Sequence, residues 1–226
     1  MNSIVENLKE IAGSLPEGVK LVAVSKTKPV EAIEEAYEAG QRVFGENRVQ
    51  ELAEKYEILP KDIEWHMIGH LQTNKVKYMA AFVSLIHGVE SLKLLETIDK
   101  EGRKHDRVIP CLLQFYIASE ETKFGLDMEE AKALLESADY KNMKNVKIVG
   151  VMGMATNTDD EVQVRREFHH LKEIFDELKA TYFAENPEFK ELSMGMSGDY
   201  RIAVEEGSTM VRVGSSIFGA RNYANI

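Results

Sequence analysis

The chain has 226 residues, 44% of them hydrophobic, and a formal net charge of −10 at pH 7. This length and hydrophobic content fit one well-filled α/β barrel, whereas the acidic balance argues against nucleic acid as a partner. Cys111 is the single cysteine, and the chain shows neither a signal-peptide pattern nor an apolar stretch of the ~20 residues that a membrane span needs. We therefore expect a cytoplasmic protein without a membrane partner.

Strand and helix patterns alternate along the chain. Short runs rich in Val, Leu and Ile predict strands, and apolar residues at helical spacing, several times ending at a glycine, predict helices. The expected strands are residues 20–24, 42–45, 64–68, 82–89, 108–117, 146–152, 192–194 and 210–213. The expected helices are residues 4–12, 30–39, 49–56, 71–79, 92–101, 128–137, 161–182 and 200–206.

This alternation indicates parallel strands joined by right-handed crossovers. About eight such units close as a (β/α)8 TIM barrel. The alternative, an open doubly wound sheet, has fewer strands and a glycine-rich fingerprint after the first one. Here the first strand is followed by residues 25–29, which contain no glycine. No linker composition divides the chain, so we predict one barrel domain over residues 1–226.

The loops after the seventh and eighth strands are rich in glycine and serine. They contain Met194, Ser197, Gly214 and Ser215. In a barrel of this kind the site lies at the C-terminal ends of the strands, and phosphate is often bound by these two loops. Glycines allow close approach of the backbone, and successive N–H groups form an anion-binding nest. Because glycine and serine are also ordinary turn residues, phosphate binding and a plain turn both remain open.

Lys26 directly follows the first buried strand, so its side chain should begin at the mouth of the barrel. A desolvated lysine near another cation, here Lys28, can attack an aldehyde as the neutral amine. The residues alone leave an aldolase-type lysine and a lysine that binds pyridoxal 5'-phosphate (PLP) equally open. His66 and His70 flank a strand end without a carboxylate in matching register, so we expect no metal site.

Several motifs together resemble the pyridoxal phosphate homeostasis proteins. The segment at residues 21–29 is similar to their lysine motif, and residues 44–47 with 49–51 to their second motif. Residues 65–75 resemble the third, and residues 123–126 the segment after the fifth strand. Residues 192–197 and 210–221 resemble the two ligand-loop motifs. The matches keep their order over residues 21–223, and hence over nearly the whole chain.

The resemblance implies a barrel like the N-terminal domain of bacterial alanine racemases, with PLP as the cofactor. It places the Schiff-base lysine at Lys26 and the phosphate contacts at Ser197, Gly214 and Ser215. It implies that Arg212 faces the pyridine nitrogen. The remaining implied cofactor-binding residues are Asn47 and Met194, and the implied auxiliary lysines are Lys28 and Lys123.

The family has no established catalytic activity, so the resemblance implies a PLP carrier in vitamin B6 homeostasis and no catalytic residue is assigned. Apo PLP-dependent enzymes would be transient recipients, and without an exposed apolar stripe we expect a monomer. An alternative is a small PLP-dependent racemase or lyase with Lys26 as base and Tyr116 or His70 opposite it. A cofactor-free aldolase is the third possibility. The sequence departs from the family pattern after Gln114 and after Ser197.

Overall fold

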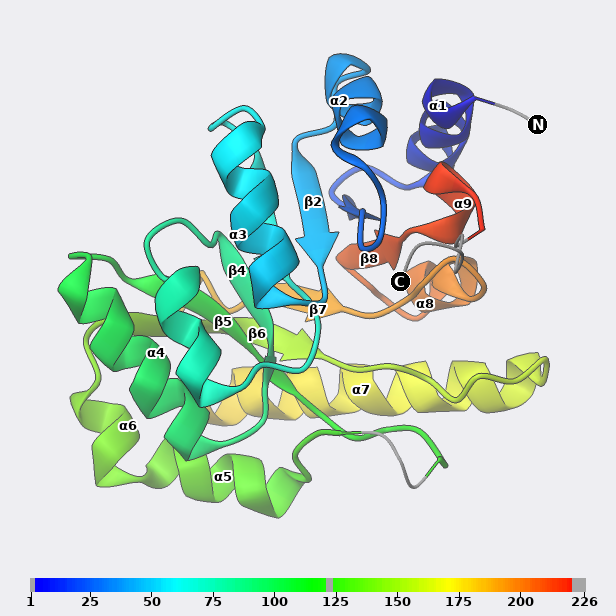
Figure 1. Cartoon of the computed structure of the whole chain (residues 1–226). Helices are drawn as coiled ribbons and strands as arrows, with labels where there is room; N and C mark the ends of the chain where they lie inside the picture. The colour runs from blue at the N-terminus through cyan, green and yellow to red at the C-terminus, as the bar shows by residue number, and fades with distance from the viewer. Residues whose placement is uncertain (1–2, 121–123, 221–226) are drawn as a thin grey trace.

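The computed structural model describes residues 3–120 and 124–220. Within these ranges the strands form a closed parallel barrel in the order β1-β2-β3-β4-β5-β6-β7-β8, which confirms the barrel predicted from the sequence (Figure 1). Pairing of β8 with β1 closes the barrel, with Arg212 opposite Val22. The strands are β1 (Lys20–Val24), β2 (Val43–Glu46), β3 (Glu64–Met67), β4 (Leu85–Val89), β5 (Ile109–Gln114), β6 (Val146–Met152), β7 (Glu191–Ser193) and β8 (Met210–Val213).

Helices surround the barrel, and the long helix α7 extends beyond it (Figure 1). The helices are α1 (Ile4–Ser14), α2 (Val30–Glu38), α3 (Val49–Ile58), the 3-10 helix η1 (Thr73–Tyr78), α4 (Leu92–Lys104), α5 (Met128–Glu136), α6 (Ala138–Asn142), α7 (Glu161–Tyr182), α8 (Tyr200–Glu205) and α9 (Ser215–Phe218). No helix in residues 3–120 and 124–220 is long and apolar enough to cross a membrane.

Several local expectations differ from the structure, among them the strand expected over residues 108–117, which ends at Gln114. The helix expected over residues 71–79 is the short 3-10 helix η1, and the strand expected from residue 82 begins only at Leu85. The helix expected over residues 128–137 is confirmed as α5, but α6, which follows it at once, was not predicted; Ser137 ends α5 and its hydroxyl then accepts the N–H of Tyr140 as the N-cap of α6. Helix α9 directly follows β8 and was not predicted, since four residues carry no periodic pattern.

The core has two parts that follow the alternation of side chains along each strand. Outward-facing residues such as Phe44 and Trp65 pack against the helices in the larger cluster. Inward-facing residues such as Val22, Leu85 and Met210 fill part of the barrel interior. A strand residue next to an outward-facing one faces inward. This rule puts several polar side chains inside the barrel, close to the C-terminal ends where a site is expected.

Candidate functional site

A cavity of about 670 Å³ opens at the C-terminal ends of the barrel strands. Six of the residues that the sequence predicted for the site line this one cavity although they come from four different strand ends: Lys26, Asn47, Ser197, Arg212, Gly214 and Ser215. Met194, the seventh, is fully buried in the hydrophobic core and is not among the residues that line the cavity. The volume is within the range of small-molecule and cofactor sites.

Ser197 joins the loop after β7 to the loop after β8. Its hydroxyl oxygen accepts the backbone N–H of Gly214 at 3.2 Å and that of Ser216 at 3.4 Å. The side chain of Ser197 therefore lies where two backbone N–H groups of the loop after β8 converge, at the wall of the cavity. Such a concentration of donors suits an anionic group.

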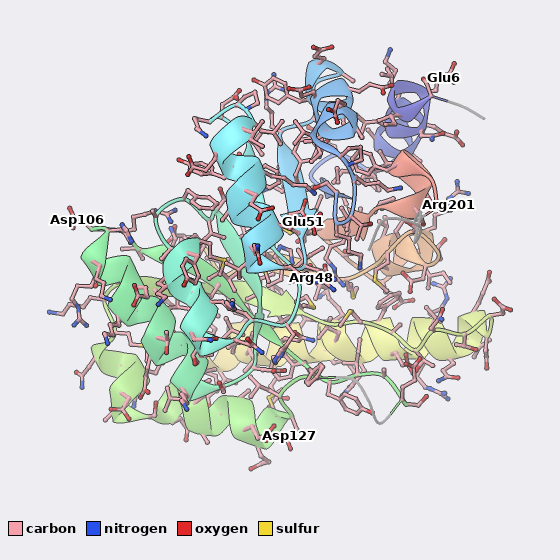
Figure 2. The ribbon with its side chains drawn as sticks, viewed as in Figure 1. Glu6, Arg48, Glu51, Asp106, Asp127 and Arg201 are labelled. Carbon is pink, nitrogen blue, oxygen red and sulfur yellow. The ribbon has the colours of Figure 1, made fainter. Side chains whose placement is uncertain are left out.

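Two side chains in the first turns of α3 hold the loop that carries Lys26 by hydrogen bonds to its backbone. Lys55, only 6% exposed, donates to the carbonyl oxygen of Ser25 at 2.8 Å. Glu51, which projects from α3 (Figure 2), accepts the backbone N–H of Thr27 at 2.6 Å. Thr27 has φ of 63°, in the left-handed region that non-glycine residues rarely adopt. These bonds hold the backbone on both sides of Lys26 in place.

Lys55, Glu46 and Ser25, which are buried, form with the half-buried Glu51 a polar group that we call the Lys55 cluster. The ammonium of Lys55 lies 2.6 Å from Glu46 and 2.7 Å from Glu51, and Ser25 donates its hydroxyl to Glu46 at 2.6 Å. Burial raises the pKa of Glu46 to about 7, although Lys55 and Ser25 act in the opposite direction. The second carboxylate oxygen of Glu46 is buried and has no hydrogen-bond partner among the residues that the structure describes.

Arg212 enters the cavity from β8 and is 4% exposed. Its guanidinium donates to the hydroxyl of Ser193 at 2.5 Å and to the carbonyl oxygen of Gly153 at 3.2 Å. No carboxylate in the described ranges forms an ion pair with it. Burial lowers the pKa of Arg212 to about 10, so the side chain still carries its charge at neutral pH. The cavity wall thus contains a buried cation whose acceptors within the described part of the chain are neutral.

The other candidates occupy different places. Lys28 lines the cavity and donates to three backbone carbonyls, those of residues 218–220. His70 also lines the cavity, stacks on Phe124 and lies 3.1 Å from a carboxylate oxygen of Glu90. Tyr116 donates its hydroxyl to the carbonyl of residue 120 and is not part of the cavity wall. Lys123 lies outside the described residues.

Sequence reasoning did not identify Lys55, Ser193 or His87. Lys55 stands in an amphipathic helix, where lysine is normally a surface residue, and its burial depends on contacts with a distant loop. Ser193 and His87 follow the inward-facing register of β7 and β4, and that alternation was the one available signal. In residues 3–120 and 124–220 no three potential metal ligands come together.

Comparison with known proteins places the chain among characterised sequences. A family model described as "Alanine racemase, N-terminal domain" matches residues 1–222. The pyridoxal phosphate homeostasis protein of Aquifex aeolicus is 42% identical over 220 residues, which cover 97% of this chain and 94% of that protein. The protein of the same name from Escherichia coli K12 is 34% identical over 238 residues and covers 99% of each chain.

Solved structures agree with these similarities. PipY of Synechococcus elongatus without PLP has a TM-score of 0.88 and 37% identity, covering 96% of this chain and 100% of PipY. PipY with PLP bound has a TM-score of 0.84 and 36% identity over the same shares. An alanine racemase of Clostridium difficile has a TM-score of 0.77, covering 99% of this chain and 57% of the racemase. At 15% identity, that last likeness concerns the fold alone.

Proposed function

The chain belongs to the pyridoxal phosphate homeostasis protein family, as its motifs predicted, and from this membership we propose that it binds PLP and takes part in PLP (vitamin B6) homeostasis. The observation that carries the proposal is the cavity at the C-terminal ends of the strands, which brings Lys26, Arg212 and the two glycine- and serine-rich loops together. We take the whole chain, residues 1–226, as one PLP-binding domain.

The residues of the cavity fit this cofactor. PLP supplies an aldehyde that forms a Schiff base with a lysine amine, and we assign that lysine to Lys26. Ser197, Gly214 and Ser215 offer the hydroxyl and N–H donors that a phosphate group requires. Asn47 lines the cavity from the end of β2, and Met194 supports the seventh loop from the core.

Arg212 fits the pyridine ring nitrogen as a hydrogen-bond donor. Arginine offers only donors, so it pairs with a nitrogen that has kept its lone pair. Its charge makes a second positive charge on that nitrogen costly, so the ring stays unprotonated. An unprotonated ring withdraws electrons weakly. This suits a protein that holds the cofactor and passes it on, and we propose apo PLP-dependent enzymes as transient recipients, with this chain acting as a cytoplasmic monomer.

A small PLP-dependent racemase or lyase is the second candidate. The observation that favours it is the contact of His70, which lines the cavity, with Glu90, because a histidine held by a carboxylate can act as acid or base. Tyr116, the other residue considered for this role, already donates its hydroxyl to a backbone carbonyl. We therefore assign no catalytic residue in the carrier, and turnover of an amino acid that is lost in His70→Ala would favour the enzyme.

The test is the absorption spectrum of the purified protein mixed with PLP, followed by borohydride reduction and peptide mapping. Lys26→Ala is compared with Lys28→Ala, because Lys28 lines the same cavity and is a matched control. We expect a near-visible band in wild type and in Lys28→Ala, its loss in Lys26→Ala, and the reduced pyridoxyl group on Lys26. Absence of the band from wild type, or its persistence in Lys26→Ala, would refute the assignment.

A further inference from the structure

A continuous series of hydrogen bonds crosses the barrel interior from Arg212. Arg212 donates to Ser193, whose hydroxyl lies 2.9 Å from Nδ1 of His87. Nε2 of His87 lies 2.9 Å from Nδ1 of His66. These four side chains, which we call the interior network, come from β8, β7, β4 and β3, and each is at most 4% exposed.

The far end of the interior network reaches the opposite mouth of the barrel. His66 lines a second cavity, of about 220 Å³, together with Lys20 and Glu64 at the N-terminal ends of β1 and β3. The ring nitrogen of His66 that is not bonded to His87 is Nε2. The series therefore starts at the cofactor cavity, passes through the core and ends at the solvent-accessible N-terminal mouth.

The direction of every bond follows from Arg212. A guanidinium has donors only, so the hydroxyl oxygen of Ser193 must accept from it. In residues 3–120 and 124–220, Nδ1 of His87 is the one acceptor within reach of that hydroxyl, and a buried hydroxyl hydrogen without an acceptor is costly, so the hydrogen goes to Nδ1 of His87. His87 then has its proton on Nε2 and donates it to Nδ1 of His66. By the same reasoning His66 carries its own proton on Nε2, facing the N-terminal mouth.

Both histidines must be neutral for this arrangement to hold. A second proton on His66 would place two donors face to face, and a second proton on His87 would leave the hydroxyl hydrogen of Ser193 without an acceptor among the described residues. The environment opposes such protonation: burial and the charge of Lys20 lower the pKa of His66 to about 3. Burial, His66 and Arg212 lower the pKa of His87 well below its ordinary value. The interior network thus keeps one arrangement throughout the physiological pH range.

We propose that Ser193, His87 and His66 are positioning residues for Arg212, and that their one-way hydrogen bonds hold its guanidinium where its free N–H groups face the cavity. Without this support a long arginine side chain has several rotamers of similar energy, and ordering it costs entropy each time a ligand binds. The role toward the pyridine nitrogen rests on the proposed function. The proton positions on the two histidines do not.

The first test needs no cofactor. Long-range 1H–15N correlation spectra of the 15N-labelled protein report the tautomer and charge of each imidazole between pH 5 and pH 8, and the six histidines are assigned by single substitution. We expect His66 and His87 to be neutral with the proton on Nε2 over the whole range. A charged ring, or a proton on Nδ1 of either residue, overturns the network.

The second test follows the bound cofactor in Ser193→Ala and His87→Leu. Ser208→Ala is the matched control, because Ser208 is also buried and contacts the strands β7 and β8, but donates only to backbone carbonyls. We expect the dissociation constant for PLP to rise about tenfold in the first two variants, which is about 1.4 kcal/mol, and not in the control.

With 15N-labelled PLP, the ring nitrogen should stay unprotonated in wild type and in the control, and should take up a proton at a higher pH in the two network variants. A ring nitrogen and a dissociation constant that match wild type in both folded variants overturn the positioning role. If wild type itself does not bind PLP, the proposed function fails. The histidine spectra of the protein alone then still decide whether the interior network exists.

Discussion

Lys55 neutralises a buried carboxylate, and its removal should destabilise the protein in a way that depends on pH. In Lys55→Met the apolar part of the side chain is kept and the ammonium is lost. Glu46, fully buried, then loses the ammonium beside it, and the carbonyl oxygen of Ser25 loses one of its two donors and keeps the backbone N–H of Lys28 at 3.0 Å. Removing one partner from a buried ion pair typically costs about 3–5 kcal/mol, because the other charge stays buried and uncompensated.

The pH dependence follows from the pKa of Glu46. It is raised from 4.5 to about 7 in the folded protein, so between these values the folded state holds a proton that the unfolded chain has released. Stability contributed by this proton is present at low pH and is lost as pH rises, by at most about 1.4 kcal/mol per pH unit. In wild type the loss ends near pH 7. In Lys55→Met the pKa of Glu46 rises further, and the loss continues above pH 7.

Urea unfolding followed by circular dichroism at pH 5 and pH 8 measures the difference. We expect Lys55→Met to lose about 3–5 kcal/mol at pH 8. At pH 5, where Glu46 is neutral, the loss should shrink to about 1.5–3 kcal/mol, for the hydrogen bond that the charged Lys55 donates to the carbonyl oxygen of Ser25. Lys172→Met is the control, since Lys172 pairs with Asp176 at the same i,i+4 spacing on the surface and should cost under about 1 kcal/mol at both pH values. Equal losses for Lys55→Met at the two pH values would refute the reasoning.

Two further substitutions and one labelling reaction test how tightly the cavity wall and the core are packed. Gly69→Ala should weaken PLP binding in an equilibrium titration, because a Cβ at this position overlaps the backbone of Asn47 in the cavity wall. Gly13→Ala is the control and should leave PLP binding unchanged, because its Cβ meets no atom within 4 Å. Gly150→Ala should cost about 3 kcal/mol in urea unfolding, because its Cβ overlaps a carbonyl oxygen of β7; a loss below about 1 kcal/mol would contradict this packing. Cys111 is fully buried with a raised thiol pKa, so iodoacetamide should label it only on unfolding, and labelling of the folded protein at the rate of a free thiol would contradict its burial.

The sequence predicted the barrel because the evidence for it is local. Each strand and helix has its own apolar pattern, and alternation alone implies parallel pairing. Lys26 and Arg212 were likewise predictable, since each stands at or next to the C-terminal end of a strand. That they line one cavity follows from the closure of β8 on β1.

The supporting residues were not predictable in the same way, because their roles depend on contacts between distant parts of the chain. His87 and Ser193 are 106 residues apart, and Lys55 and Ser25 are 30 apart. Nothing in the neighbouring sequence of either pair marks the contact. Register gave only the side of the strand that each residue faces, and a polar residue on the inward face can equally line a cavity or bond within the core.

Two separate polar groups thus support the cavity. The Lys55 cluster lies on the outer side of the barrel wall, because Gly45 faces the interior residue Val22 and Glu46, next to it, faces α3. The interior network lies inside the wall, and the hydrogen bonds of the two groups share no partner. One holds the loop of Lys26 and the other holds Arg212, so each fixes one end of the site before a ligand arrives.

Independence of the two groups is measurable. Residues without shared partners contribute additively, within about 0.5 kcal/mol. In a double-mutant cycle on the dissociation constant for PLP, the effects of Lys55→Met and Ser193→Ala should therefore add within this limit. A larger coupling would mean that the loop of Lys26 and the guanidinium of Arg212 move together. The two polar groups would then support the cavity wall as one coupled unit and not as two independent rigid supports.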